Sequence, residues 1–375
     1  MSPKVLVMTK HSNELRAVAA YGLAGSLTEM PTQPLSGDAF DRLHARVRQQ
    51  KLTGLFWAAI SDGAFPVTGD QREAAEGTHL HALTGVVQLE SLLLETVETL
   101  DRAGIPVRAL KGTALAHLDY PVPEQRTFGD IDLLVPSGSF DDAVATLTSL
   151  GCQRRFAEPR PGFDRRFAKG TCLRTRNGLE IDLHRSFSMG PFGELLALAE
   201  LWAESDFYEV EGTRVDALAV EARLLHAAYH ATLGNRPPLL VPLRDVAQIL
   251  LTQDVSWARL QQMMTASTGE PVVATAVATA WRELAIADVL AVSSWAAGYQ
   301  ASPRAAGDMA VYGLNSSYAA TSVRTLRAIP SVNDRVRFLL ALGMPESSYF
   351  ENRHDSRLDR FRRGLSDIRR PRETL

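Results

Sequence analysis

The segment QRTFGDIDLLVP, residues 125–136, places the strongest constraint on the fold of this chain. Asp130 and Asp132 lie two residues apart inside a largely apolar run. In a β-strand, residues i and i+2 point to the same side, so a strand here would hold both carboxylates together while Ile131 and Leu133 face the other way. Two like charges held this close repel. The usual reason for such a pair is a divalent cation, since Mg²⁺ binds carboxylate and phosphate oxygens together.

The residues around this segment alternate short β-like runs with single helices, which is typical of an α/β or α+β unit. VRALKG is predicted to be a buried strand, TALAHL a short helix, and SFDDAVATLTSLG a helix that begins at Ser139 and ends before Gly151. The segment DIDLLV is the second strand of this unit. We therefore expect a compact β-containing core over residues 99–216.

A hairpin is predicted at Asn177-Gly178, because this dipeptide between two β-like runs is the strongest short-range hairpin signal. Its second strand, LEIDLH, carries Asp182 on the same side as Glu180 and His184. We expect this side to be shared with Asp130 and Asp132.

Helical patterns dominate both flanks of this core. In THLHALTGVVQLESLLLETVETLDRAG, leucines and valines recur every three or four residues, and AVEARLLHAAYHATLG and LLVPLRDVAQILL continue the pattern after about residue 217. The predicted fold is α+β, with a small mixed sheet as the core and helical regions at 1–98 and 217–375. We expect these helical regions to pack on either side of the sheet and to form a cleft for a substrate.

Composition narrows the class of protein. A net charge of −3 over 375 residues argues against a protein that mainly binds nucleic acid non-specifically. Only Cys152 and Cys172 are present, so no disulfide framework or cysteine-rich zinc site is implied, and a cytoplasmic location is expected. The start of the sequence has no signal-peptide pattern, and no apolar run reaches the roughly 20 residues of a membrane helix. The basic stretch HDSRLDRFRRGLSDIRRPRETL is mixed with acids and favours a solvated helix over a nucleic-acid arm.

The order of these motifs carries a resemblance. ALKGTALAHLDYP is followed by GDIDLLV, then by IDLHRS and the helical LLHAAYHAT. This order resembles the nucleotidyltransferase superfamily related to DNA polymerase β, and more narrowly a little-characterised bacterial nucleotidyltransferase family, over about residues 100 to 260. The turn of that superfamily is most often Gly-Gly or Gly-Ser, whereas this chain has Gly112-Thr113 after Lys111.

The resemblance implies a site and a reaction. Gly112 and Thr113 would hold the triphosphate of a nucleotide, Asp130 and Asp132 would bind metal, and Asp182 would complete the site. The metal would be Mg²⁺ or Mn²⁺, and two ions would stabilise the attacking and leaving oxygens. The substrate would be a nucleoside triphosphate, with ATP favoured, and the acceptor a hydroxyl of a small molecule, peptide or macromolecule.

Two basic residues near these motifs, Lys111 and Arg126, each have two possible roles. Lys111 would supply a point charge to the phosphates, although a lysine in a turn is usually only solvated. Arg126 would either pair with a phosphate or neutralise the aspartates.

Several further residues are candidates for accessory roles. His184 could orient a carboxylate or contact substrate, and Asp245 could face the cleft from an otherwise apolar helix. His226 and His230 have the spacing of a zinc pair, but HAAYH lacks the glutamate of a metalloprotease, so packing is favoured. Both cysteines are expected to fill the core, and Gly170 in AKGTC resembles a phosphate turn only superficially.

Two other functions stay open at this level. One is a catalytically inactive module that binds a nucleotide or a partner, which the presence of all three carboxylates disfavours. The other is a toxin-type enzyme that acts on RNA or protein, for which the near-neutral charge makes nucleic acid the less favoured partner. Repulsion between the paired aspartates further predicts that metal-free Asp132→Asn is as stable as the parent or slightly more so.

Overall fold

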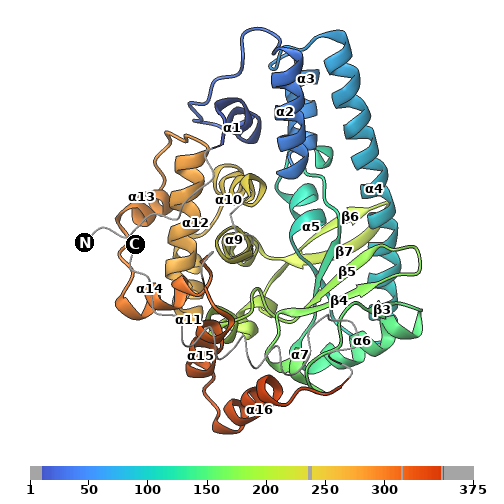
Figure 1. The fold of residues 1–375 in the computed structure, drawn as a ribbon, viewed down its shortest axis with the longest axis vertical. Helices are drawn as coiled ribbons and strands as arrows, with labels where there is room; N and C mark the ends of the chain where they lie inside the picture. The colour runs from blue at the N-terminus through green and yellow to red at the C-terminus, as the bar shows by residue number, and fades with distance from the viewer. Residues whose placement is uncertain (1–10, 235–238, 314–315, 348, 350–375) are drawn as a thin grey trace.

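The computed structural model describes residues 11–234, 239–313, 316–347 and 349 (Figure 1). Its strands are β1 (Arg108–Ala109), β2 (Ile131–Leu134), β3 (Gln153–Arg154), β4 (Gly170–Arg174), β5 (Glu180–His184), β6 (Ser205–Val210) and β7 (Thr213–Leu218). Its helices are α1 (Asn13–Ala20), α2 (Gly37–Gln49), α3 (Thr53–Ser61), α4 (Gly69–Arg102), α5 (Lys111–Leu118), α6 (Phe140–Ser149), α7 (Phe163–Arg166), α8 (Pro191–Glu194), α9 (Val220–Tyr229), α10 (Leu240–Thr252), α11 (Trp257–Ser267), α12 (Glu270–Glu283), α13 (Ala291–Gly298), α14 (Pro303–Ala310), α15 (Tyr318–Ala328) and α16 (Val332–Gly343).

All of these strands belong to one mixed sheet. Their order is β3-β4-β5-β2-β1-β7-β6. The neighbours β2 and β5 are parallel, as are β1 and β7, and the other pairs are antiparallel. The predicted α+β fold, with a mixed sheet and with helical N-terminal and C-terminal regions, is therefore confirmed.

The two faces of the sheet bury different sets of side chains. Ile131 and Leu133 of β2 join one core cluster, whereas Leu134, one residue on, joins the other. This alternation follows from the pleat of the strand, which the sequence of β2 predicts. One face can thus be wholly apolar while the other carries the carboxylates.

Helices cover both faces, but not in the arrangement expected from the sequence. Helices α4 and α6 pack against the apolar face (Figure 1). The opposite face meets a large core in which α1, α2 and α3 lie together with α9, α10 and α12. Of the N-terminal helices, only α4 takes the side opposite the C-terminal ones. The proposed divisions near residues 98 and 216 remain predictions, and α4 runs across the first of them.

Local sequence signals explain several boundaries. Helix α4 begins with a capping box, in which Thr68 and Gln71 each accept from the backbone N–H of the other. Helix α6 begins after Ser139, and β4 and β5 form the hairpin predicted at Asn177-Gly178. Gly170 is required by packing, since a Cβ there would lie 2.0 Å from the Leu183 carbonyl oxygen on β5.

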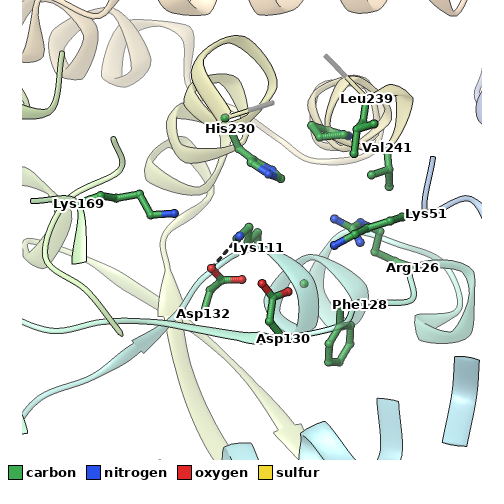
Figure 2. Close-up of a pocket in the computed structure, with 13 residues that line it drawn as sticks. Lys51, Lys111, Arg126, Phe128, Asp130, Asp132, Lys169, His230, Leu239 and Val241 are labelled. Carbon is green, nitrogen blue, oxygen red and sulfur yellow. Dashed lines mark ion pairs between the residues drawn. The ribbon is translucent and has the colours of Figure 1, made fainter. Parts of the chain in front are cut away.

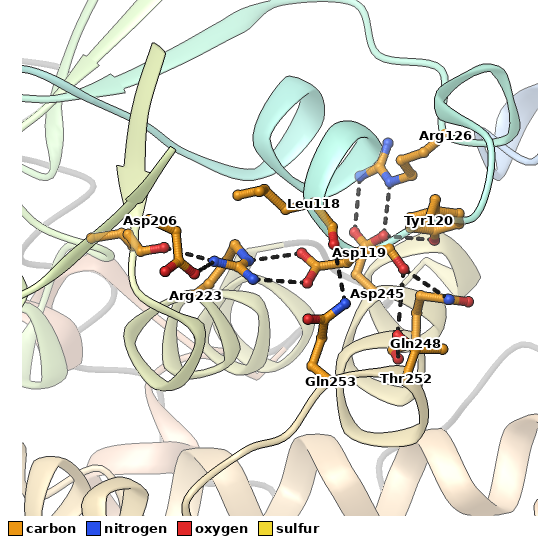
Figure 3. Close-up of polar contacts among 11 residues, drawn as sticks. Leu118, Asp119, Tyr120, Arg126, Asp206, Arg223, Asp245, Gln248, Thr252 and Gln253 are labelled. Carbon is orange, nitrogen blue, oxygen red and sulfur yellow. Dashed lines mark hydrogen bonds and ion pairs between the residues drawn. The ribbon is translucent and has the colours of Figure 1, made fainter. Parts of the chain in front are cut away.

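A buried polar network ties the segment between α5 and β2 to the C-terminal helices (Figure 3). Arg126 binds Asp245 of α10 through two hydrogen bonds of 2.8 and 2.9 Å. Arg223 of α9 binds Asp119 in the same bidentate way, at 2.8 and 3.0 Å. A buried charge is tolerated only when it is paired, so these contacts fix the chain that leads into β2.

No helix in the described ranges is both long and apolar enough to cross a membrane. The basic stretch HDSRLDRFRRGLSDIRRPRETL, for which a solvated helix is predicted, lies outside the described residues.

Removing Asp245 should be strongly destabilising. Asp245→Ala leaves the Arg126 guanidinium buried without its partner, which typically costs about 3–5 kcal/mol of the free energy of unfolding. Urea denaturation measures this cost. Asp254→Ala, a change at an exposed aspartate, is the control and should stay within about 0.5 kcal/mol of the parent.

A double variant separates loss of the pair from loss of charge. Arg126→Met with Asp245→Leu removes both charges together and should recover most of the lost stability. If Asp245→Ala were no less stable than the exposed control, the network would not hold this segment in place.

Candidate active site

The parallel pairing of β2 with β5 brings two aspartates together. Asp132 is the register partner of Asp182, and Leu134 is the partner of His184. In-register neighbours on adjacent strands point to the same face, so both carboxylates lie on the face opposite Ile131 and Leu133. The structure thus confirms the predicted shared side for Asp132, Asp182 and His184, whereas Asp130 lies just before β2.

Asp132 is the most tightly held of these groups. It is 2% exposed, and its Oδ1 lies 2.7 Å from Lys111 Nζ and accepts a hydrogen bond of 2.8 Å from His184 Nε2. Burial alone would raise the pKa of Asp132, but the charge of Lys111 and the hydrogen bond from His184 outweigh burial and hold that pKa well below its usual range. The protein itself therefore supplies two partners for the Asp132 carboxylate, Lys111 and His184.

Asp130 differs from Asp132 in its surroundings. Burial, followed by the neighbouring charge of Asp132, raises the pKa of Asp130, and the opposing charges of Lys111 and Lys51 are the smaller effects. The repulsion between the two carboxylates therefore destabilises mainly the ionised form of Asp130. The contacts of Asp132 with Lys111 and His184 favour the opposite of the expectation from the sequence: removing the charge of Asp132 should destabilise the metal-free protein.

The described residues include one group whose atoms could hold a metal ion together. Ligand atoms of Asp132, Asp182 and His184 all lie within 4.8 Å of one another. Both described polar contacts of the Asp132 side chain use Oδ1, which leaves Oδ2 to face an ion. Hard carboxylate oxygens suit Mg²⁺ or Mn²⁺, and the bond from His184 Nε2 would orient Asp132 as an outer-shell partner. Asp130 lies outside this group, so its predicted role as a ligand remains a prediction.

A cavity of about 240 Å³ opens beside these carboxylates (Figure 2). Asp130 and Asp132 form part of its wall, with Lys51, Lys111 and Lys169 around them. It is completed by Gly112, Arg126, Phe128, His230, Gly234, Leu239, Val241 and Pro242. Residues from both flanking helical regions and from the β-containing core therefore share one cleft, as the sequence predicts.

Of the three candidate residues in the turn at the start of α5, two line the cavity and Thr113 does not. Lys111 and Gly112 line the cavity. Gly112 has φ +27° and ψ −100°, a conformation that side chains disfavour, and an added Cβ would lie 3.2 Å from Phe128. Thr113 is 1% exposed, and its hydroxyl lies 3.0 Å from Tyr208 Oη. The predicted contact between the Thr113 hydroxyl and phosphate therefore does not follow from this geometry.

Two other predicted residues pair with each other. Arg126 lines the cavity, but its guanidinium is committed to Asp245, whose carboxylate outweighs the effect of burial and raises the pKa of Arg126. Asp245 is 1% exposed and does not line the cavity. The expectation that Asp245 faces the cleft is wrong, and Arg126 is better explained as a positioning residue than as a phosphate ligand.

Sequence reasoning missed Lys51, Lys169 and His230 as residues of the cavity. Lys169 had a signal, because Lys169-Gly170-Thr171 repeats the letters of Lys111-Gly112-Thr113. Burial and the charge of Lys111 lower the pKa of Lys169. Lys51 and His230 had no usable signal, since each comes from a helical region whose pattern encodes packing.

Packing accounts for His226 and Cys152, whereas Cys172, which the sequence predicts to be in the core, is only partly buried. The ring of His226 lies 4.6 Å from that of Phe187, which agrees with the expected packing role. Cys172 pairs in register with Asp182, and burial followed by the charge of Asp182 raises the pKa of its thiol to about 12. A thiol with so high a pKa is a poor nucleophile.

The sequence of this chain matches the model of one protein family. The model of the family described as "Uncharacterised nucleotidyltransferase" matches residues 36–280 of this chain. The match covers more than half of the 375 residues and extends well into the N-terminal helices. A search of curated proteins gives no match.

Two solved structures are similar to parts of this chain. One is the antibiotic-resistance factor ANT(2'')-Ia, at 17% sequence identity and a TM-score of 0.30, over 54% of this chain and 95% of that chain. The other is an antigenic nucleotidyltransferase-like protein from Paracoccidioides brasiliensis, at 15% identity and a TM-score of 0.34, over 53% of this chain and 92% of that chain.

The two neighbouring aspartates should respond oppositely to neutralisation in metal-free protein. Asp132→Asn deprives buried Lys111 of its partner and should lower the free energy of unfolding by about 3 kcal/mol. Asp130→Asn removes a carboxylate whose raised pKa marks it as destabilised in the folded state, so this variant should melt at or above the parent. Thermal melting in chelator compares the pair directly. A fall of equal size in both variants would contradict the assignment of repulsion to Asp130.

Stability should fall in mild acid because of the buried histidines. Burial holds the pKa of His226 well below the ordinary value of 6.5, so below that pH the unfolded chain takes up a proton that the folded chain does not. The loss is at most about 1.4 kcal/mol per pH unit for each such histidine.

A substitution identifies the contribution of His226. His226→Gln should make the fall in unfolding free energy between about pH 7 and about pH 5.5 smaller than in the parent. His81→Gln, a change at an exposed histidine, should leave that fall as it is. Parallel curves for His226→Gln and the parent would exclude His226 as a source of the acid sensitivity.

Proposed function

This chain belongs to the family of uncharacterised nucleotidyltransferases, and from that premise we propose that it transfers a nucleoside monophosphate from a nucleoside triphosphate to a hydroxyl group. The observation that carries the proposal is the in-register pair Asp132 and Asp182, with Asp130 two residues before Asp132 in the wall of the adjoining cavity. The three carboxylates come from two segments of the sequence about 50 residues apart. Their convergence disfavours an inactive module that merely keeps the fold.

The metal in this proposal is Mg²⁺ or Mn²⁺, held by Asp132 Oδ2, Asp182 and Asp130. A divalent ion bound there would stabilise charge on the attacking and leaving oxygens. His184 would keep Asp132 oriented through the hydrogen bond to Oδ1.

The nucleotide in this proposal is ATP or another triphosphate, bound beside the α5 turn. Gly112 presents backbone to the phosphates without a Cβ in the way, and the first N–H groups of α5 favour an anion. Lys111 and Lys169 supply positive charge on the same side of the cavity. These charges would oppose the negative charge that builds on the departing pyrophosphate.

The chemical step requires a hydroxyl oxygen to bond to the α-phosphorus while the bond to the β-phosphate oxygen breaks. Asp182 is the carboxylate that we propose accepts the hydroxyl proton. The products are the nucleotidylated acceptor and pyrophosphate. A small molecule or peptide is favoured as acceptor over RNA because the chain carries a net charge of −3. Both described cysteines are free, and we propose the cytoplasm as the compartment.

Binding is the first test of this function. Purified protein should be stabilised against heat by a nucleoside triphosphate together with Mg²⁺ and much less by either alone. A screen of the four common triphosphates would identify the preferred base. Equal melting curves with and without every triphosphate would overturn the proposal.

Loss of Asp182 is the second test. Once an acceptor is found, Asp182→Asn should reduce pyrophosphate release on the order of a thousandfold, since it removes a metal ligand and the proton acceptor. Asp216→Asn, at a half-exposed aspartate of β7 outside the cavity, is the matched control and should keep parental activity. Parental rates in Asp182→Asn would remove Asp182 from the catalytic group.

A further inference from the structure

Lys51 is the one lysine of the cavity that comes from outside the β-containing core. It lies at the corner between α2 and α3, far in sequence from the aspartates that it faces. The inference about the ligand of Lys51 rests on the proposed function, because only a nucleotidyl transfer requires an acceptor beside the nucleotide and the metal.

The corner that carries Lys51 is fixed on both sides. The side chain of Gln50 is buried, and its Oε1 accepts a hydrogen bond of 2.7 Å from the backbone N–H of Leu240, at the start of α10. Leu52 is 0% exposed, and its N–H donates to the carbonyl of Val47. The backbone of Lys51 is thus held between two anchored neighbours, beside the residues that begin α10.

The conformation of Lys51 is one that lysine disfavours. Its φ is +57°, in the left-handed region where glycine or asparagine is the easier choice. Glu211, Thr268 and Ala285 also have positive φ, but none of them lines the cavity. The conformation belongs to the turn that ends α2, in which the Leu52 N–H donates to the Val47 carbonyl, and this turn fixes the backbone of Lys51 at the cavity wall.

Lys51 and Lys169 approach the cavity from opposite sides, with Asp130 and Asp132 between them (Figure 2). Lys111 forms an ion pair with Asp132, and burial together with the nearby charge of Lys111 lowers the pKa of Lys169. In a phosphoryl-type transfer the attacking and leaving oxygens are roughly in line on opposite sides of phosphorus. If Lys111 and Lys169 hold the pyrophosphate end of the nucleotide, Lys51 lies on the side from which the acceptor attacks.

The surroundings of Lys51 favour a small ligand with a charged end. The cavity measures about 240 Å³, and Leu239, Val241 and Pro242 form apolar wall beside it. The guanidinium of Arg126, the other cation on this side, is already paired with Asp245. Lys51 is exposed and forms no ion pair with the other described residues, although its charge acts on the nearby Asp130, so its ammonium group is available to a ligand.

We propose that Lys51 binds an anionic group of the acceptor, a phosphate or a carboxylate, and that the acceptor is a small anionic hydroxyl compound. The ammonium group would hold the acceptor by its charged end while the hydroxyl faces the aspartates. Neutral hydroxyl compounds and RNA are the alternatives that the following experiments exclude or establish.

Binding to the nucleotide-loaded protein tests the proposal without turnover. The protein is saturated with Mg²⁺ and α,β-methylene-ATP, which cannot release pyrophosphate, and is then titrated with inorganic phosphate or with acetate while thermal melting is followed. We expect one of these anions to raise the melting temperature further, and its identity tells phosphate from carboxylate. In Lys51→Asn this second rise should be lost, whereas the dissociation constant of the analogue should change less than threefold.

Three variants serve as controls. Asparagine tolerates the left-handed region, so Lys51→Asn should fold, and Lys51→Gly should melt at or above the parent because it relieves the backbone. Lys51→Arg keeps the charge and should keep the response to the anion. Arg48→Met removes an exposed positive charge of α2, the helix before Lys51, outside the cavity and should also keep that response.

The failures of the two proposals are distinguishable. Absence of any binding of the analogue with Mg²⁺ overturns the proposed function and this inference with it. Binding of the analogue without any effect of phosphate or acetate overturns the inference alone. A tenfold or larger loss of analogue affinity in Lys51→Asn also overturns it, since Lys51 would then bind the triphosphate.

Transfer of label from [α-³²P]ATP provides the test of substrate class. Hydroxyl compounds are offered in matched pairs with and without a phosphate or carboxylate, such as glycerol 3-phosphate and glycerol. Labelling of anionic members at least tenfold above their neutral partners, reduced in Lys51→Asn, supports the proposal. Equal labelling of both members, or labelling of RNA only, overturns it.

Discussion

The in-register parallel pairing of β2 with β5 is the constraint on which the site depends. It places Asp132 beside Asp182 and lets His184 reach Asp132. Because side chains alternate along a strand, a slip of one residue would turn one of these carboxylates into the apolar layer under α4 and α6. The hydrophobic side chains of β2 and β5 thus fix the register, and the register fixes the chemistry on the opposite face.

Burying this much charge next to a core is possible only because the charges are paired. Lys111 and His184 hold Asp132, Asp245 holds Arg126, and further along the same network Asp119 holds Arg223 (Figure 3). These pairs lie around the segment that connects α5 with β2. They therefore stabilise the approach to the candidate metal ligands and not the ligands alone.

The cavity depends on parts of the chain that the sheet does not include. Helices α1, α2 and α3 share a core with α9, α10 and α12, so the corner at Lys51 and the start of α10 are held against each other. The family match, which begins at residue 36, spans α2 and α3 as well. An acceptor site that uses the flanking helices can thus change while the sheet and its carboxylates stay the same.

The sequence by itself indicated the strands β2 and β5 and the shared face of Asp132 and Asp182, because side chains alternate along a strand and the hairpin turn has a local signal. It also placed Lys111 and Gly112 correctly at the turn. Only the tertiary structure decided that Asp132 is paired with Lys111, that Asp245 neutralises Arg126, and that Lys51 and His230 reach the cavity. Such pairings join residues far apart in the chain, and a helical pattern encodes which face is buried but not which polar group it will meet.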